Sequence, residues 1–330
     1  MKNLGFLRVA AVAFLALCSA SHVEAQVDLQ AVGNDHVSIT INGQPFSDFN
    51  FGPAYTKPFL APLRTATGVT VSRRFPMERV EGESSDHPHQ RGLWIGYGAI
   101  NHVNFWENDA SSQTSGGNPG SKGVLVLERL EEVKPGKKSG SVTAIFGWRA
   151  PGHGDRGGEV MEERRVMTFY AEPDIRTVDV DTTLTARTQV KFDDTKEGFF
   201  AIRLADGMTE KNGGMMTNSE GVQTDKNVWG KRAEWVDYDG TVEGQKVGVV
   251  IFDNPRNLNH PPRWHARAYG LFAVNPFGLK EFDAKATGQG GYEMAAGASL
   301  RLRYRVIIHP GDVPKKKIER WYADYAKKAK

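Results

Sequence analysis

The sequence predicts an all-β protein, built as a large two-layer antiparallel β-sandwich with a helix at its C-terminal end. Its periodic segments mostly alternate apolar and polar residues, or are rich in β-branched and aromatic residues, as half-buried strands are. Hardly any helical periodicity lies between them, which argues against a parallel α/β sheet. We expect strands at residues 36–41, 68–75, 123–130, 141–148, 164–170, 175–186, 198–204, 247–252, 269–274 and 300–308.

The clearest strand patterns are at 177–182 and 300–306, where every second side chain is apolar. One face of each strand is therefore expected in the core and the other in water. Asn42-Gly43 predicts a hairpin turn, because both residues tolerate positive φ.

The C-terminal helix is predicted by a stripe of apolar residues that follows Pro314, a residue suited to a first helical turn. The stripe consists of Ile318, Trp321, Tyr322 and Tyr325, at i, i+3, i+4 and i+7. We expect this stripe to dock on the sandwich.

Residues 1–25 have the pattern of a secretory signal: Lys2 and Arg8, an apolar run at 9–18, and small residues before a cleavage site after Ala25. The run has about half of the ~20 apolar residues that a membrane-spanning helix needs, and no later segment comes closer. The mature protein, residues 26–330, is therefore expected to be one domain, periplasmic or secreted, without membrane insertion.

Composition excludes several classes of chemistry. Cys18, the only cysteine, lies in the signal, so a mature chain would have no disulfide and no thiolate catalyst or ligand. Removing Lys2, Arg8 and Glu24 changes the formal net charge from +3 to +2, and the remaining charges are spread along the chain. Nothing in that distribution predicts a nucleic-acid partner.

The segment at residues 86–94, Asp-His-Pro-His-Gln-Arg-Gly-Leu-Trp, is the strongest candidate for a functional site, because it gathers a carboxylate, two imidazoles and a guanidinium. Pro88 disfavours a helical conformation at His87, so we expect an extended segment with His87 and His89 on the same side. Such a segment could bind a metal ion or a sugar.

Other candidates combine polar and aromatic residues in later segments. Those predicted to bind substrate are Asp86, Arg91, Trp94, Asn104, Arg203, His260, Trp264 and Asn275, and those predicted to act in catalysis are His87, His89, Glu197 and His265. Arg203 is notable because it interrupts an apolar strand, where a guanidinium needs an anionic or hydroxyl-rich partner. Trp94 or Trp264 would offer an apolar face to a sugar ring.

Four ordered motifs carry a resemblance to a known family. They lie at residues 86–94, 194–198, 248–254 and 264–277. They resemble a bacterial family of exported proteins of unknown function whose members are often labelled "methane oxygenase PmoA", and the resemblance covers essentially the whole mature chain. Gln90 and His102 stand where family members usually carry histidine and glycine. The label implies a metal-dependent oxidase, whereas the sandwich design resembles aldose mutarotases and related carbohydrate enzymes, which is an analogy of fold.

Two chemistries fit the candidate residues. In one, His87 and His89 supply two nitrogens to a divalent metal such as zinc, His265 or Glu197 completes the site, and a metal-bound water reacts. In the other, no metal takes part: a histidine and Glu197 exchange protons with a sugar, as in epimerisation, β-elimination or glycoside cleavage.

The sequence thus favours an exported carbohydrate-active enzyme whose cofactor is unknown. Two alternatives stay open: a β-sandwich that binds glycans without catalysis, and the metal-dependent oxidase that the family label implies.

Overall fold

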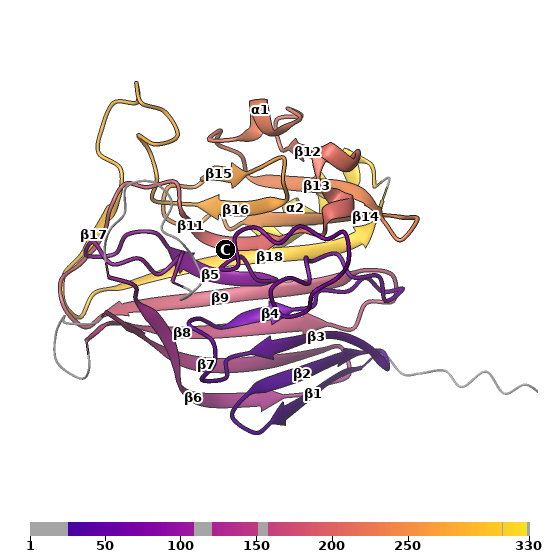
Figure 1. Ribbon diagram of the computed structural model, residues 1–330, viewed down its shortest axis with the longest axis horizontal. Helices are drawn as coiled ribbons and strands as arrows, with labels where there is room; N and C mark the ends of the chain where they lie inside the picture. The colour runs from indigo at the N-terminus through magenta and orange to yellow at the C-terminus, as the bar shows by residue number, and fades with distance from the viewer. Residues whose placement is uncertain (1–25, 109–120, 151–157, 312, 329–330) are drawn as a thin grey trace, which may run out of the picture.

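The computed structural model describes residues 26–108, 121–150, 158–311 and 313–328. Figure 1 shows two large antiparallel sheets stacked face to face. In spatial order, the first sheet contains β1 (Val27–Val32), β2 (His36–Ile41), β3 (Gln44–Asn50), β4 (Phe59–Ala61), β5 (Leu93–Tyr97), β11 (Gly198–Arg203), β16 (Leu271–Asn275) and β15 (Arg263–Ala266). All its neighbouring strands pair antiparallel.

The second sheet also has eight strands. In spatial order they are β12 (Met215–Asn218), β13 (Trp235–Val242), β14 (Gln245–Asp253), β18 (Ser299–Pro310), β9 (Arg176–Ala186), β8 (Glu159–Tyr170), β7 (Ser139–Arg149) and β6 (Val124–Lys134). The smaller elements are the β10 (Val190–Phe192) and β17 (Tyr292–Met294) ribbon, the 3-10 turns η1 (Asp206–Met208) and η2 (Glu210–Asn212), and the helices α1 (Asp225–Val228) and α2 (Lys315–Lys328).

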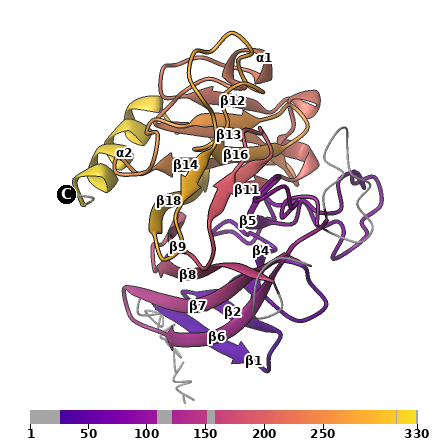
Figure 2. The same cartoon turned by 90° about the vertical axis from the view of Figure 1, so that its left-hand side faces the viewer.

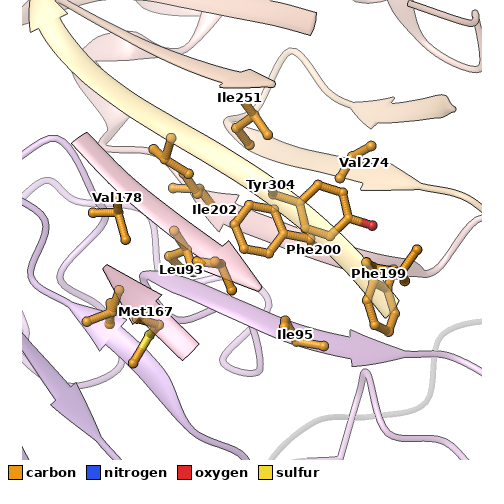
Figure 3. Close-up of a cluster of buried hydrophobic side chains, with 14 of the residues drawn as sticks. Leu93, Ile95, Met167, Val178, Phe199, Phe200, Ile202, Ile251, Val274 and Tyr304 are labelled. Carbon is orange, nitrogen blue, oxygen red and sulfur yellow. The ribbon is translucent and has the colours of Figure 1, made fainter. Parts of the chain in front are cut away.

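The space between the sheets is filled by a continuous apolar core to which both sheets contribute (Figure 3). At its centre, the rings of Phe200 from β11 and Tyr304 from β18 stack with centroids 4.5 Å apart and planes at 11°. The alternation in β9 and β18 places Val178 and Val306 in this core, so one face of each strand is buried there as predicted. The predicted all-β sandwich with a C-terminal helix is confirmed.

Nearly all of the predicted strands are present, and the predicted hairpin at Asn42-Gly43 joins β2 to β3 with positive φ at both residues. The strand predicted at 68–75 is wrong, because that segment makes isolated bridges instead of a ladder. Here side chains form hydrogen bonds with backbone N–H groups that would pair between strands in a regular ladder. Thr65 Oγ1 accepts the Val69 N–H, and Ser72 Oγ accepts the Leu63 N–H.

Helix α2 docks on the outer face of the second sheet, as Figure 2 shows beside β14. Ile318, Tyr322 and Tyr325 are buried there against an apolar patch on β13, β14 and β18. The predicted stripe is therefore the docking surface. No helix in the described ranges is both long enough and apolar enough to span a bilayer, and the predicted signal lies outside the described residues.

The outer face of the first sheet carries a second, smaller apolar cluster, and this face positions the candidate site. Trp94, Ala201, Ala273 and His265 lie directly opposite one another across β5, β11, β16 and β15. Trp94 and the two alanines belong to the apolar cluster, and His265 follows them in the row. The small alanine side chains leave room above this row for side chains from the connecting loops.

We predict that Ile318→Ala lowers the free energy of unfolding by about 2–4 kcal/mol, because it removes buried methylene groups from a side chain that is 2% exposed. Urea denaturation followed by circular dichroism measures the change. Lys316→Ala, on the exposed side of the same helix, should change stability little. Equal effects of the two substitutions would contradict the docking.

Candidate functional site

Two buried guanidinium groups converge on one carboxylate at the start of the histidine motif. Asp86 Oδ1 accepts hydrogen bonds from Arg73 Nη1 at 2.5 Å and from Arg203 Nη2 at 2.7 Å. The arginine side chains are 0% and 1% exposed. Partial burial would raise the pKa of Asp86, but the hydrogen bond from His87 and the charges of Arg203 and Arg73 outweigh it and hold that pKa far below its usual range. Arg203 therefore has the anionic partner that the sequence predicted.

The same arginines shape the backbone of the motif. Arg73 Nη2 donates to the carbonyl oxygens of His87 and Gln90, at 2.9 and 3.2 Å, and Arg203 Nη1 donates to Gln90 Oε1 at 2.5 Å. The Gln90 N–H returns to the His87 carbonyl at 3.0 Å, so His87-Pro88-His89-Gln90 is a turn, with φ of 43° at His87. The predicted extended conformation is wrong, because Arg73 draws two carbonyl groups toward one guanidinium.

The two imidazoles are nevertheless neighbours. The His87 and His89 ring centroids are 5.6 Å apart, and the His87 ring stacks on Tyr269 at 5.3 Å with planes at 5°. His87 Nδ1 lies 2.7 Å from Asp86 Oδ2, and the His87 side chain is 39% exposed. His89 is buried, and burial followed by the positive charge of Lys57 lowers its pKa well below the usual value. His89 is therefore neutral at physiological pH, while His87 faces solvent.

Glu197 and His265 form the second part of the site. His265 Nδ1 lies 3.9 Å from Glu197 Oε2, and Lys196 Nζ lies 3.3 Å from Glu197 Oε1. Burial raises the pKa of Glu197, although Lys196 and His87 oppose the shift. Burial, with help from the charges of Lys196 and Arg267, lowers the pKa of His265 to about 3. The site thus pairs a carboxyl group of raised pKa with a neutral imidazole.

The four residues that the sequence predicted for catalysis lie in two contacting pairs. His87 and His89 are in ring contact, and His265 faces Glu197, whose pKa also responds to His87. The exposed edges belong to His87 and Glu197, because the side chain of His265 is 4% exposed and His89 is 3% exposed.

Of the predicted substrate-binding residues, Arg91 and Trp94 lie beneath the site. The Arg91 guanidinium packs over the rings of Tyr55 and Phe59, and Trp94 contacts Trp106 at a centroid distance of 5.0 Å. Trp94 is 0% exposed, so it supports the site from below without presenting a ring face to solvent.

Two of the residues predicted to bind substrate use their side-chain amides for hydrogen bonds to the backbone. Asn104 Oδ1 accepts the N–H groups of Trp106 and Glu107. Asn275 uses all of its amide capacity: Nδ2 donates to the carbonyls of Thr195 and Lys196, and Oδ1 accepts two further N–H groups. In this conformation Asn275 holds the loop that carries Glu197, and a ligand would have to displace that loop to reach it.

Two other predicted residues point elsewhere. Trp264 is 0% exposed in the core between the sheets, where its Nε1 donates to the Ala233 carbonyl. It cannot be a sugar platform in this conformation, because strand alternation sends Trp264 inward and His265 outward. His260 Nδ1 lies 2.7 Å from Asp253 Oδ2, at the end of β14 in the second sheet and close to Tyr322 of α2.

Sequence reasoning missed Arg73, Tyr269, Lys57 and Lys196. Arg73 lies at an alternate position after Val69 and Val71, the same pattern of a buried cation in an apolar segment that identified Arg203. Lys57 is 1% exposed and donates to the Trp106 carbonyl and to Asn108 Oδ1. No local pattern distinguishes it from a surface lysine.

The predicted three-histidine metal site is not assembled. His87 Nδ1 is taken by Asp86, and the one potential metal-binding group of three side chains found in the described part of the chain lies on the other sheet, at Asp237, Asp239 and His309. A metal at His87, His89 and His265 would require rearrangement of the motif.

The chain belongs to a family of unknown function (DUF6807), whose model matches residues 36–323. This description does not carry the methane-oxygenase label, which stays a prediction from resemblance. No curated protein matches the chain.

Several solved structures are similar to the chain at low identity. A galactose mutarotase-like protein from Clostridium acetobutylicum is 9% identical with a TM-score of 0.43, over 87% of this chain and 99% of that one. A galactose mutarotase related enzyme from Lactobacillus acidophilus is 8% identical with a TM-score of 0.34, over 87% and 98%. The α-galactosidase from Lactobacillus brevis is 9% identical with a TM-score of 0.43, over 86% of this chain and 39% of the enzyme. The chain thus spans about two fifths of the α-galactosidase.

We predict that in Asp86→Asn the free energy of unfolding depends less steeply on pH in the acidic range than it does in the wild type. The pKa of Asp86 is lower in the folded than in the unfolded protein, where it is near 3.8, so its contribution to stability is complete above that value and is lost as the pH falls below it. Urea denaturation at several pH values between about 2 and 6 measures this slope. Asp35→Asn is the matched control, because Asp35 pairs with His36 at 3.0 Å on the surface. Equal slopes for wild type and Asp86→Asn would contradict the role of the arginine pair.

Proposed function

We propose that this member of the DUF6807 family is an exported enzyme that acts on a carbohydrate by acid–base chemistry, with Glu197 and His87 as the proton-transfer groups. The observation that carries the proposal is the environment of Glu197: a mostly buried carboxyl group, 25% exposed at its side chain, whose pKa is raised by burial. A carboxyl group of raised pKa holds and releases a proton closer to neutral pH than an ordinary glutamate does, which is what general acid–base catalysis requires.

His87 is the partner because it is both oriented and accessible. Asp86 binds Nδ1 and Tyr269 stacks on the ring, so Nε2 is the nitrogen left to exchange a proton with a ligand. A carboxylate that binds one imidazole nitrogen fixes the tautomer and the orientation of the ring. The Asp86–His87 pair is therefore arranged as an oriented base or acid.

His89 and His265 have a different role in this proposal. Their low pKa values keep both rings neutral, so neither supplies a proton as an imidazolium. A neutral imidazole still donates and accepts hydrogen bonds. His265, beside Glu197, is placed to hydrogen-bond a ligand hydroxyl and to position the carboxyl group.

The substrate class follows from the groups gathered around His87. The ring of Tyr269 stacks on His87, and the carboxyl group of Glu197 lies beside the ammonium group of Lys196 and the imidazole of His265. This combination suits a neutral ligand with many hydroxyl groups. The guanidinium groups of Arg73 and Arg203 are committed to Asp86, so they are not spare anion binders. Epimerisation, β-elimination and glycoside cleavage all use such a pair of proton-transfer groups, and product analysis distinguishes them.

We predict that Glu197→Gln and His87→Gln each reduce turnover by about 10²–10⁴-fold, the usual contribution of a positioned acid or base. The measurement is mass analysis of products after incubation with a panel of oligosaccharides of neutral and acidic sugars. His36→Gln is the matched control, because His36 also follows an aspartate and pairs with it, but lies on β2.

Normal turnover in both site variants would overturn the assignment. Wild-type protein that retains oligosaccharides and leaves every one unchanged would instead establish the non-catalytic glycan-binding alternative.

We also predict that Glu197→Gln increases the free energy of unfolding at neutral pH. The pKa of Glu197 is higher in the folded than in the unfolded protein, where it is near 4.5, so ionisation above that value costs stability that an amide does not lose. The gain should disappear as the pH falls below about 4.5. Urea denaturation at pH 4 and pH 7 tests this, and a loss of stability at pH 7 equal to that at pH 4 would contradict it.

A further inference from the structure

A second cluster of chemically active side chains lies on the outer face of the other sheet. Asp239 on β13, Gly248 on β14 and His309 on β18 are directly opposite one another across three neighbouring strands. Asp237 lies two residues before Asp239, on the same face of β13. The imidazole of His309 and the carboxyl group of Asp239 therefore meet over the glycine, and the carboxyl group of Asp237 lies beside His309.

Gly248 makes this convergence possible. A Cβ atom at position 248 would lie 2.1 Å from His309 Cε1 and 2.4 Å from Asp239 Oδ1, which is far inside van der Waals contact. The side chains of His309 and Asp239 thus occupy the position that a Cβ atom would take at residue 248, and only glycine lets them approach each other there.

The donor atoms are close enough to share an ion. His309 Nε2 lies 3.0 Å from Asp237 Oδ1, and one ligand atom from each of Asp237, Asp239 and His309 lies within 4.8 Å of the other two. A tetrahedral zinc ion with bonds of about 2.1 Å holds its ligand atoms about 3.4 Å apart, so binding would draw the most distant of these atoms closer by roughly 1 Å.

The other imidazole nitrogen is held as it is in metal sites. His309 Nδ1 lies 2.7 Å from the carbonyl oxygen of Pro310, an acceptor that requires a proton on Nδ1. A histidine that donates one ring nitrogen to a backbone carbonyl presents the other to a metal, with its tautomer and orientation fixed. Here that other nitrogen, Nε2, lies 3.0 Å from Asp237 Oδ1.

Charge and access favour a cation. Asp237 and His309 are 3% and 1% exposed and pair with each other at 3.0 Å, but a single imidazole can balance only one of the two carboxylates. Asp239 also lines a pocket of about 190 Å³, with Met215, Lys246 and Gly311 among its walls, which gives an ion a route from solvent. Lys246 is the competing cation at this entrance.

We propose that Asp237, Asp239 and His309 bind a divalent transition metal, zinc in the first instance, with water completing its coordination. One imidazole and two carboxylates suit zinc better than calcium or magnesium, which take oxygen ligands only. The ion would tie β13 to β18 across β14, and its role would be structural and separate from the acid–base chemistry at Glu197.

The test is calorimetric titration of Zn²⁺ into the mature, untagged protein after dialysis against a chelator. We expect one binding site whose affinity falls at least tenfold in Asp239→Asn and in His309→Gln, and rises in Lys246→Ala. His87→Gln is the control, and it should bind Zn²⁺ as the wild type does. Ca²⁺ and Mg²⁺ titrated in the same way should bind far more weakly.

Absence of Zn²⁺ binding by the folded wild type would overturn the proposal and leave a protonated His309 bound to Asp237 alone. Binding that survives in Asp239→Asn and is lost in His87→Gln would place the metal at the other histidines and overturn it equally. Asp239→Asn keeps the test decisive if His309→Gln does not fold, because Asp239 is the least buried of the three ligands.

Discussion

The ion pair between Asp86 and two buried arginines is the interaction on which the candidate site depends. A guanidinium that is removed from water is stable only where an anion and hydrogen-bond acceptors surround it. Arg73 and Arg203 meet that requirement with Asp86 and with the carbonyl and amide oxygens of the adjoining turn. The hydrogen bonds that compensate for burying the two cations also fix the conformation of this turn, and the turn sets the orientation of His87.

This arrangement explains what the sequence could predict and where it went wrong. Arg203 in an apolar strand predicted a buried anionic partner from composition alone. Strands β11 and β16 followed from their apolar and β-branched residues, whereas β5, the other neighbour of β11, was not predicted. The turn at His87 did not follow, because local preferences around Pro88 favour an extended chain and the distant Arg73 overrides them. Contacts between residues far apart in sequence are invisible to patterns that extend over a few residues.

Trp264 and His265 show the same limit at the level of a single strand. Both were predicted to face a ligand, yet consecutive strand residues point to opposite faces, so at most one of them could. Which one faces outward depends on the register of β15 against β16, where His265 pairs with Ala273 on the outer face and Trp264 with Val274 in the core. The sequence of a four-residue strand carries too little alternation to determine that register.

The candidate acid–base site and the proposed metal site occupy opposite outer faces of the sandwich, and the packed core separates them. His265 belongs to the row on the outer face of the first sheet, whereas His309 lies on the outer face of the second, near Trp321 of α2. The residues between them, such as Phe200 and Tyr304, are stacked and fully buried. Substitutions at distant sites without shared partners add independently. A metal that stiffens β13, β14 and β18 would therefore stabilise the scaffold while leaving the protonation of Glu197 to its own neighbours on the first sheet.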